Sequence, residues 1–242
     1  MAVAHDFTSS RTRRLVAVSG GAAFAIAVLY GAWLYAGRFG APAEAAATPG
    51  PPAAVNIALF IAFGLHHSLF ARTSVKTRLT TFVPAELERT TYVWVASILF
   101  VVLVGFWQPV SGTLWQTESP AAWLIRGVQF VGALFLLWVG RHIDVAAMAG
   151  IRGPRSERRP EDSALTDRGP YRLVHHPLYL AILLLLWAVP VMTNTRLLFA
   201  VLNTVYVVVA IPFEERDLRR SFGAEYERYA QRVRSRVLPG VY

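Results

Sequence analysis

Long apolar runs separated by short polar segments constrain this chain more than any other feature of its sequence. A membrane hydrocarbon core about 30 Å thick needs roughly 20 mostly apolar residues for each helical crossing. Such runs occupy 15–37, 53–71, 90–109, 121–140, 177–193 and 196–214. They predict an all-α, polytopic integral membrane protein with about six transmembrane helices. Pro190 and the short polar residues to Thr195 join the last two runs as a tight hairpin, for which a re-entrant hairpin is the alternative.

Composition supports a membrane protein without a separate soluble domain. Of the 242 residues, 55% are hydrophobic and 16% are charged, whereas soluble domains have about 25% charged residues. We expect one membrane domain over 1–242, made of a four-helix part at 1–140 and a cytosolic loop, helical hairpin and tail at 141–242. A cytosolic amphipathic helix is expected near the C-terminus. The absence of cysteine excludes disulfides, thiolate metal sites and a cysteine nucleophile.

The basic residues predict how the chain is oriented. If the N-terminus is inside, all 24 Lys and Arg lie in inner segments except Arg38, Arg126 and Arg196. Positively charged loops stay on the cytoplasmic side, so we expect both termini in the cytoplasm of a bacterial inner membrane. Arg126 lies within the fourth run and is expected to reach the outer headgroups. The net charge of +9 is spread between apolar runs, which disfavours nucleic acid as a partner and leaves membrane lipid.

Polar residues gather near the predicted cytoplasmic ends of the runs, where burying an ionisable group is costly unless it is paired or functional. The clusters are His66-His67-Ser68, Arg141-His142-Ile143-Asp144, and Gly169 to Tyr179 together with Glu214-Glu215. Anchoring at the headgroups is the structural alternative for such residues. Adjacent histidines point about 100° apart on a helix, so only one of His66 and His67 can face a small site.

The third cluster carries the most chemistry. Pro177 is suited to begin a helix, which would leave upstream amides free to bind a ligand carboxylate. His176 could donate a hydrogen bond, Tyr179 could present its ring to a cation, and the glutamates supply negative charge. This pattern predicts a site for a zwitterionic or cationic ligand, with glutamates that merely cap a surface helix as the alternative. The candidate residues are Tyr171, Arg172, His175, His176, Pro177, Leu178, Tyr179, Glu214 and Glu215.

Segment 169–239 resembles the isoprenylcysteine carboxyl methyltransferase and phospholipid methyltransferase superfamily of membrane enzymes. The resemblance rests on His176-Pro177-Leu178-Tyr179 before a hairpin, on Glu214-Glu215, and on the tail from Phe222 to Tyr229. It implies that S-adenosylmethionine binds between the first two elements, under a lid formed by the C-terminal amphipathic helix. His175 stands where the superfamily usually has arginine, and Arg172 is the candidate substitute.

Several further segments look most like the methanethiol S-methyltransferases of that superfamily: Trp187 to Thr193, Leu198-Phe199-Ala200, His66-Ser68, Arg72 and Trp107-Gln108-Pro109. The resemblance implies methylation of a small thiol, methanethiol, to dimethyl sulfide, without a metal. A base must then remove the thiol proton, and histidine suits that role. We expect His142 to be the base, assisted by Asp144, with His66 or His67 as the next candidate.

Two other functions remain open at this point. A prenylcysteine carboxylate or a phospholipid amine could take the place of the thiol as methyl acceptor. From another class, a haem-binding membrane isomerase or redox protein is possible, because His67-Ser68 and His176-Pro177 also resemble elements of zeta-carotene isomerase relatives. Two histidines would then ligate the haem iron.

Overall fold

The computed structural model describes residues 10–42, 51–70, 75, 78, 80–144 and 165–241. Arg72, most of the outer segment 41–54 and the greater part of the predicted cytosolic loop, 145–164, lie outside the described residues. The long helices are α1 (Ser10–Ala36), α2 (Pro52–Phe70), α4 (Ala85–Gly105), α5 (Ala121–Gly140) and α8 (Asn194–Phe222). The shorter elements are η1 (Arg38–Gly40), β1 (Thr113–Gln116), η4 (Gly169–Arg172), α7 (Pro177–Trp187), β2 (Val191–Thr193) and α9 (Ala224–Arg232).

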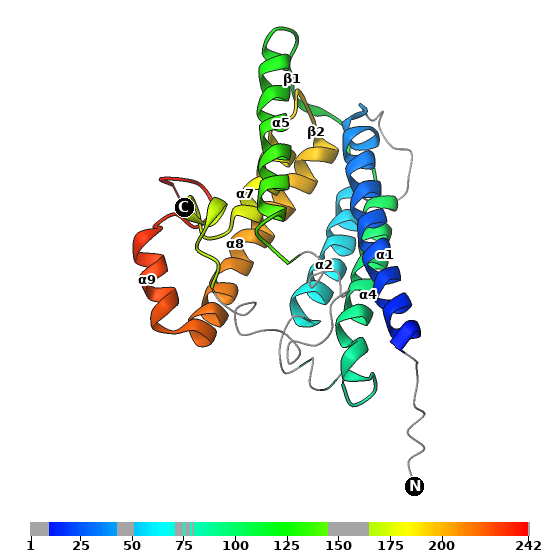
Figure 1. Ribbon diagram of the computed structural model, residues 1–242. Coiled ribbons are helices and arrows are strands. Elements are labelled where there is room, and N and C mark those ends of the chain that lie inside the picture. Colours follow the sequence, from blue (N-terminus) through cyan, green and yellow to red (C-terminus); the bar gives the residue numbers. More distant parts are fainter. Residues whose placement is uncertain are drawn as a thin grey trace.

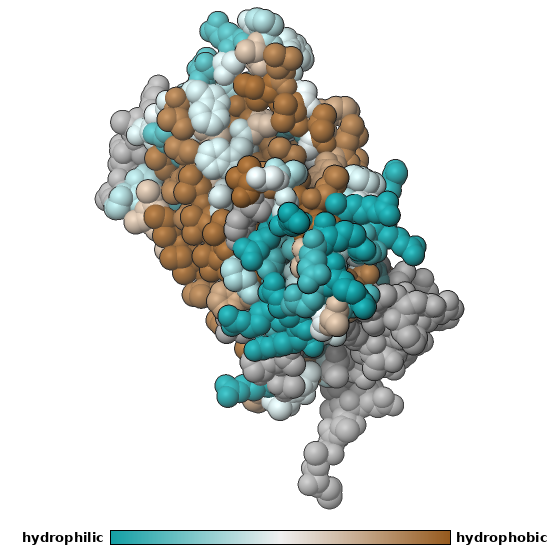
Figure 2. Space-filling model, turned by 90° about the vertical axis from the view of Figure 1, so that its left-hand side faces the viewer, coloured by the Kyte–Doolittle hydropathy of each residue, from teal (hydrophilic) through white to brown (hydrophobic). Residues whose placement is uncertain are grey.

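Five helices are long and apolar enough to cross a membrane: α1, α2, α4, α5 and α8. They confirm the all-α, polytopic membrane class. Helices α1, α2 and α4 stand together on one side of the molecule and α5, α7 and α8 on the other (Figure 1). On the face shown in Figure 2, a broad apolar belt covers the helices and a hydrophilic patch lies near α9. The belt is the surface that a bilayer would cover.

The fifth apolar run differs from the predicted helix. Helix α7 has only 11 residues, which makes it about 16 Å long. Residues 188–193 continue in a largely non-helical conformation into β2, and extended backbone covers about 3.3 Å per residue. The run begins beside Glu214 of α8 and ends where α8 starts. A short helix and an extended segment therefore return along the length that α8 covers with helix alone.

The extended part requires partners for its backbone groups, because a bilayer offers none. Strand β2 pairs antiparallel with β1, with Thr113 opposite Thr193 and Gln116 opposite Val191. The Trp115 indole donates to the Val189 carbonyl over 3.0 Å, and the Thr117 amide donates to the Pro190 carbonyl over 2.9 Å. This two-stranded sheet was not predicted. It provides hydrogen-bond partners for the backbone of the segment after α7, which has no helical hydrogen bonds.

Aromatic packing joins the two groups of helices near the sheet. Trp107 and Phe39 are 1% exposed and stack with ring centroids 5.9 Å apart. Phe199 of α8 packs edge-on against both rings. A second buried cluster contains Val174, Ile211 and Val237. It fixes the segment before α7, the second half of α8 and the C-terminal tail relative to one another, and these segments carry the candidate site.

Candidate active site

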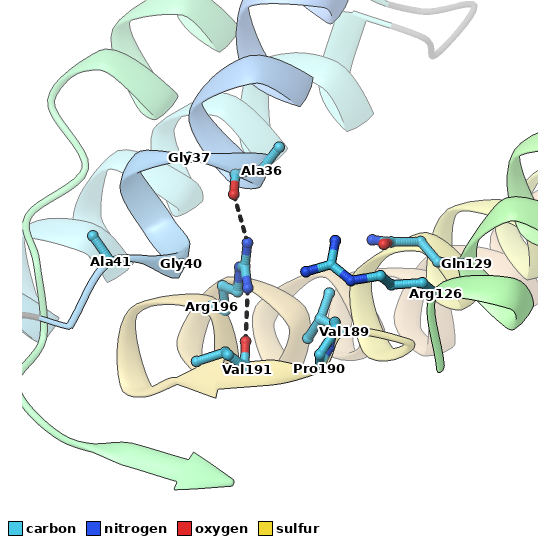
Figure 3. A pocket seen from close by; sticks show the side chains of 10 residues that line it. All are labelled: Ala36, Gly37, Gly40, Ala41, Arg126, Gln129, Val189, Pro190, Val191 and Arg196. Atoms are coloured by element: carbon cyan, nitrogen blue, oxygen red, sulfur yellow. Dashed lines mark hydrogen bonds between the residues drawn. The ribbon is translucent and has the colours of Figure 1, made fainter. Parts of the chain in front are cut away.

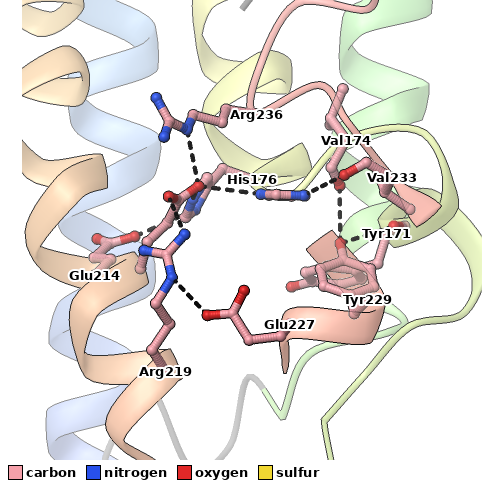
Figure 4. Close-up of polar contacts among 11 residues, drawn as sticks. Tyr171, Val174, His176, Glu214, Arg219, Glu227, Tyr229, Val233 and Arg236 are labelled. Carbon is pink, nitrogen blue, oxygen red and sulfur yellow. Dashed lines mark hydrogen bonds and ion pairs between the residues drawn. The ribbon is translucent and has the colours of Figure 1, made fainter. Parts of the chain in front are cut away.

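Three segments meet at the opposite end of the molecule from the sheet: residues 173–176, the second half of α8, and the tail after α9 (Figure 4). The tail runs beside the first segment, because the amides of His175 and His176 donate to the carbonyls of Ser235 and Arg236 over 3.0 and 2.9 Å. The expectation that these amides are free for a ligand carboxylate is therefore wrong. Pro177, buried at the first position of α7, does begin the helix as predicted.

Glu215 joins the three segments. Its side chain is 2% exposed, and its Oε1 accepts from His175 Nδ1 and from Arg236 Nε, each over 3.1 Å. Arg219, one turn later in α8, lies with Nη2 3.5 Å from Oε2. A buried carboxylate is tolerated when it is paired in this way. Glu215 therefore acts mainly as an internal ion-pair partner.

His175 lies between two acceptors. Its Nδ1 faces Glu215, and its Nε2 lies 2.5 Å from the Val233 carbonyl. The side chain thus faces the buried carboxylate from the position where the superfamily usually has arginine. Arg172 is exposed in η4, and the arginine beside this pair is Arg236 of the tail.

Glu214 and its partners are arranged differently. The Glu214 side chain is 45% exposed; its Oε2 lies 3.4 Å from His176 Nδ1, and its Oε1 accepts from the Tyr179 hydroxyl. The rings of His176 and Tyr179 stack with centroids 5.6 Å apart. His176 Nε2 is buried and makes no hydrogen bond within the described part of the chain. An oriented carboxylate and an unsatisfied nitrogen are suited to bind a polar ligand. Leu178, which lies between His176 and Tyr179 in sequence, is half-buried.

An aromatic cavity of about 210 Å³ opens beside His175. Tyr171, Phe222, Tyr226 and Tyr229 line it. The Tyr229 hydroxyl donates to the Tyr171 carbonyl over 2.8 Å, whereas the buried Tyr226 hydroxyl has no hydrogen-bond partner among the described residues. Burial, reinforced by the Glu215 charge, raises the pKa of Tyr226 to about 12. The cavity therefore offers flat apolar faces and the neutral Tyr226 hydroxyl.

Helix α9 builds one wall of this cavity because its two faces differ. Tyr226 and Tyr229 are buried, while Glu225 and Glu227 are exposed. Arg219 Nε contacts Glu227 over 3.1 Å, and Arg232 Nη2 contacts Asp167 over 2.5 Å. These ion pairs attach the helix at both ends. Helix α9 thus packs its buried face over the cavity.

His142 lies at the end of α5, half-buried. Its Nδ1 is 2.9 Å from the Trp138 carbonyl, which can only accept, so this nitrogen carries the hydrogen and Nε2 is the basic one. The ring lies against Gly169, where an added Cβ would be 2.2 Å from Nε2. Gly169 begins the turn that carries Tyr171. Asp144 is exposed two residues after His142.

The other two candidate histidines lie on α2. His67 Nδ1 is 2.9 Å from the Tyr92 hydroxyl, and its ring packs edge-on against Tyr206. His66 stacks on Tyr92 at 5.5 Å, and its Nδ1 is buried without a hydrogen bond among the described residues. The structure thus places His142 beside η4, and His67 between Tyr92 of α4 and Tyr206 of α8.

A metal ion is the other ligand to consider. His175, His176 and Glu215 each offer one possible metal-ligand atom, and these three atoms lie within 4.8 Å of one another. This spacing would allow them to bind one metal ion. However, Glu215 Oε1 already accepts from His175 and Arg236. The Arg236 guanidinium on this oxygen would repel a divalent ion. The unsatisfied Tyr226 hydroxyl and His176 Nε2 instead favour an organic ligand with hydrogen-bonding groups.

Sequence reasoning missed the contribution of the tail beyond α9. Arg236, Val233 and Ser235 all contact the residues before α7 or the glutamate pair. Tyr92 and Tyr206, which approach His67 and Ser68, were also missed. Two buried tyrosines spaced three apart in a charged segment were the available signal for α9. No comparable pattern marks Ser235 or Val233, because they act through backbone groups.

Comparison with known proteins agrees with this arrangement. The family described as phospholipid methyltransferase matches residues 128–225. Methanethiol S-methyltransferase 2 of Bradyrhizobium diazoefficiens is 38% identical over 226 residues, which are 90% of this chain and 87% of that protein. Methanethiol S-methyltransferase of Mycobacterium tuberculosis is 32% identical over 80% of this chain and 81% of its own length.

The Pseudomonas deceptionensis enzyme of the same name is 33% identical over 74% of this chain and 70% of its own length. No solved structure matches the chain. The haem-protein alternative loses its support, because these relatives are methyltransferases. With this identity and coverage, the chain is a membrane enzyme that belongs to the methyltransferase family of the methanethiol S-methyltransferases.

Proposed function

We propose that this enzyme methylates methanethiol to dimethyl sulfide with S-adenosylmethionine as the methyl donor. The observation that carries the proposal is the 38% identity to methanethiol S-methyltransferase 2 over 90% of this chain. Relatives of the same name in several bacteria support the small thiol over a prenylcysteine or phospholipid amine.

The candidate site fits the methyl donor chemically. The aromatic cavity lined by Tyr171, Tyr226 and Tyr229 is suited to an adenine ring. The unsatisfied Tyr226 hydroxyl and His176 Nε2 can serve its polar groups. Glu214, 45% exposed, supplies negative charge for its cationic groups. Glu215 and His175 hold these residues in position from beneath.

The reaction is an in-line displacement between two sulfur atoms. S-adenosylmethionine supplies a methyl group bonded to a positive sulfur; the thiolate forms the new carbon–sulfur bond as the old one breaks. The products are dimethyl sulfide, S-adenosylhomocysteine and the proton lost by the thiol. The protein must align the thiol, exclude water and accept that proton. Few polar groups are needed for these tasks, which suits a site at the end of an apolar helix bundle.

For the base we propose His142, because its Nδ1 is bonded to the Trp138 carbonyl and its basic Nε2 points to η4. The carbonyl also orients the ring, a role for which Asp144 was expected. His67 is the second candidate, since its ring contacts Tyr206 of α8, the helix that carries Glu214. His142→Ala should lower kcat strongly and change donor affinity little. An equal loss of donor affinity with unchanged kcat would contradict the assignment, and the same measurement on His67→Ala separates the two.

We further propose that the site opens to the cytoplasm of a bacterial inner membrane, with both termini on that side. The distribution of Lys and Arg supports this orientation. It also gives the site access to a water-soluble nucleotide donor. Cysteines introduced one at a time beside α9 and beside β1 would report the orientation through labelling with an impermeant maleimide, because the chain has no cysteine of its own.

The decisive experiment incubates the purified protein with methyl-labelled S-adenosylmethionine and, separately, methanethiol, a prenylcysteine and phosphatidylethanolamine. Gas chromatography of the headspace should detect labelled dimethyl sulfide with methanethiol. Label in either of the larger acceptors, and none in the headspace, would reject the small-thiol proposal while retaining a methyltransferase. Glu214→Gln serves as the control for transfer that depends on the candidate site.

A further inference from the structure

A second cavity lies at the sheet end of the molecule, far along α8 from the candidate active site. It has a volume of about 350 Å³ and is enclosed by the end of α1, η1, α5 and β2 (Figure 3). Two of its ten lining residues are arginines, Arg126 and Arg196, and none is acidic. Gln129 adds an amide. The cavity is therefore strongly positive for its size.

Arg196 is held rigidly in this cavity. It is 8% exposed and makes four hydrogen bonds, two to the Tyr35 carbonyl and one each to the carbonyls of Ala36 and Val191. A guanidinium has five N–H groups, so one remains available. Carbonyls at the end of α1 offset only part of a full positive charge. Arg196 thus presents a fixed, incompletely balanced cation.

Arg126 extends from the second turn of α5 toward Arg196 (Figure 3). The two positive charges repel one another. Within the described part of the chain, Arg126 makes no hydrogen bond or ion pair. Bringing two guanidinium groups to one small cavity is unfavourable unless an anion lies between them or beside them. The arrangement therefore indicates an anion-binding site.

The surroundings indicate which anion. Arg126 lies five residues after the first residue of α5, about 8 Å along the helix axis and thus near headgroup depth. Trp123 and Leu124 on the same helix are 70% and 74% exposed on the apolar belt. Guanidinium groups bind phosphate oxygens with paired hydrogen bonds. Phosphate, at a boundary between lipid and water, matches both the charge and the location.

We propose that this cavity binds a phosphate group through Arg126, the available N–H of Arg196 and Gln129. A phosphodiester in a phospholipid headgroup and a free phosphate share this chemistry. The site is separate from methyl transfer, because its residues lie near the opposite end of α8 from Glu214. Its function would be to anchor the α1, α5 and β2 ends to one another through the bound anion.

The test compares Arg126→Gln with Arg38→Gln in the detergent-purified protein. Arg38 lies at the same end and bonds the Gly105 carbonyl over 2.9 Å, but does not line the cavity, so it controls for the loss of one charge. Native mass spectrometry with equimolar dioleoyl phosphatidylglycerol and phosphatidylcholine measures bound lipid. Thermal unfolding in inorganic phosphate, against chloride at equal ionic strength, measures binding of the free anion.

Arg126→Gln should lower phosphatidylglycerol occupancy, or phosphate-dependent stabilisation, about fivefold, while Arg38→Gln resembles the wild type. Arg126→Lys, which retains the charge without the paired donors, should fall between them. An effect on the lipid alone identifies a headgroup site, and an effect on phosphate alone identifies a free-anion site. Equal binding by wild type and Arg126→Gln, or equal losses in Arg126→Gln and Arg38→Gln, would overturn the proposal. Dimethyl sulfide formation is measured separately and does not enter this comparison.

Discussion

Replacing Glu215 with glutamine removes the buried carboxylate that joins α8 to His175 and to the tail. Of its partners, His175 has a side chain 6% exposed, whereas the side chains of Arg236 and Arg219 are 40% and 43% exposed. Water can solvate the two arginines when the carboxylate is lost, so each contributes less than about 1 kcal/mol. The buried His175 ring, by contrast, stays out of water and loses the carboxylate that it faces. It determines the size of the effect.

Removing one partner of a buried ion pair costs about 3–5 kcal/mol. The exposed arginines place Glu215→Gln at the lower limit, about 3 kcal/mol. For a chain of this size, each kcal/mol lowers Tm by about 2–4 °C, so we expect a fall of about 6–12 °C. The tail should also detach, because its ion pair with α8 is lost.

Glu214→Gln is the matched control, since the same change is made one residue away. The Glu214 side chain is 45% exposed and contacts His176 and Tyr179 at the surface of the site. Its loss should lower Tm by less than about 3 °C. The affinity for S-adenosylmethionine should instead fall at least about tenfold, which corresponds to about 1.4 kcal/mol.

Thermal unfolding in detergent and isothermal titration calorimetry with S-adenosylmethionine measure the two effects separately. Glu215→Gln should reduce Tm most, and Glu214→Gln should weaken binding most at a temperature where both variants are folded. A Glu215→Gln variant that unfolds within about 2 °C of the wild type would refute the ion-pair reasoning. Equal falls in Tm for the two variants would refute the division of roles between neighbouring glutamates.

Three further changes test the site. Tyr226→Phe should preserve Tm and weaken S-adenosylmethionine binding in calorimetry, because this hydroxyl has no hydrogen-bond partner among the described residues. Tyr229→Phe loses the bond to the Tyr171 carbonyl and should lower the free energy of unfolding by about 1 kcal/mol. The opposite pattern would exclude Tyr226 from the ligand site. Gly169→Ala should reduce kcat and stability together, because Gly169 has a φ of +57° and the new methyl group would displace His142. Wild-type kinetics in this variant would show that the contact with His142 is unimportant. Extended dialysis against EDTA should leave methyl transfer unchanged, and activity restored only by added zinc would instead support a metal at His175, His176 and Glu215.

The apolar runs predicted the membrane class and most helix positions because hydrophobic length is a local property of the sequence. The helix predicted from the sixth run, 196–214, ended too early. Helix α8 continues to Phe222 through Glu214, Glu215 and several arginines, which hydropathy assigns to water. In the structure the helix extends beyond the apolar belt to carry the site. The fifth run was misjudged because an apolar sequence does not distinguish a helix from an extended segment with its own partners.

Residue types in the sequence indicated which residues form the candidate site. They did not predict the contacts that these residues make inside it. His176, Tyr179 and Glu214 were identified because histidine, tyrosine and glutamate are rarely placed near a membrane without function. Which glutamate faces inward could not be predicted, since it depends on Arg236, 21 residues later in sequence. The bonds from His175 and His176 to Ser235 and Arg236 join backbone amides to backbone carbonyls. Such contacts leave no trace in the identity of the residues.

The pairing of residues 175–176 with residues 235–236 also bears on how the site is assembled. Glu215 has one countercharge on its own helix, Arg219, which is in place as soon as α8 has formed. The other, Arg236, lies on the tail and reaches Glu215 only when the chain closes a loop of 21 residues. Assembly of the site therefore depends on tertiary docking of the tail as well as on formation of the helix.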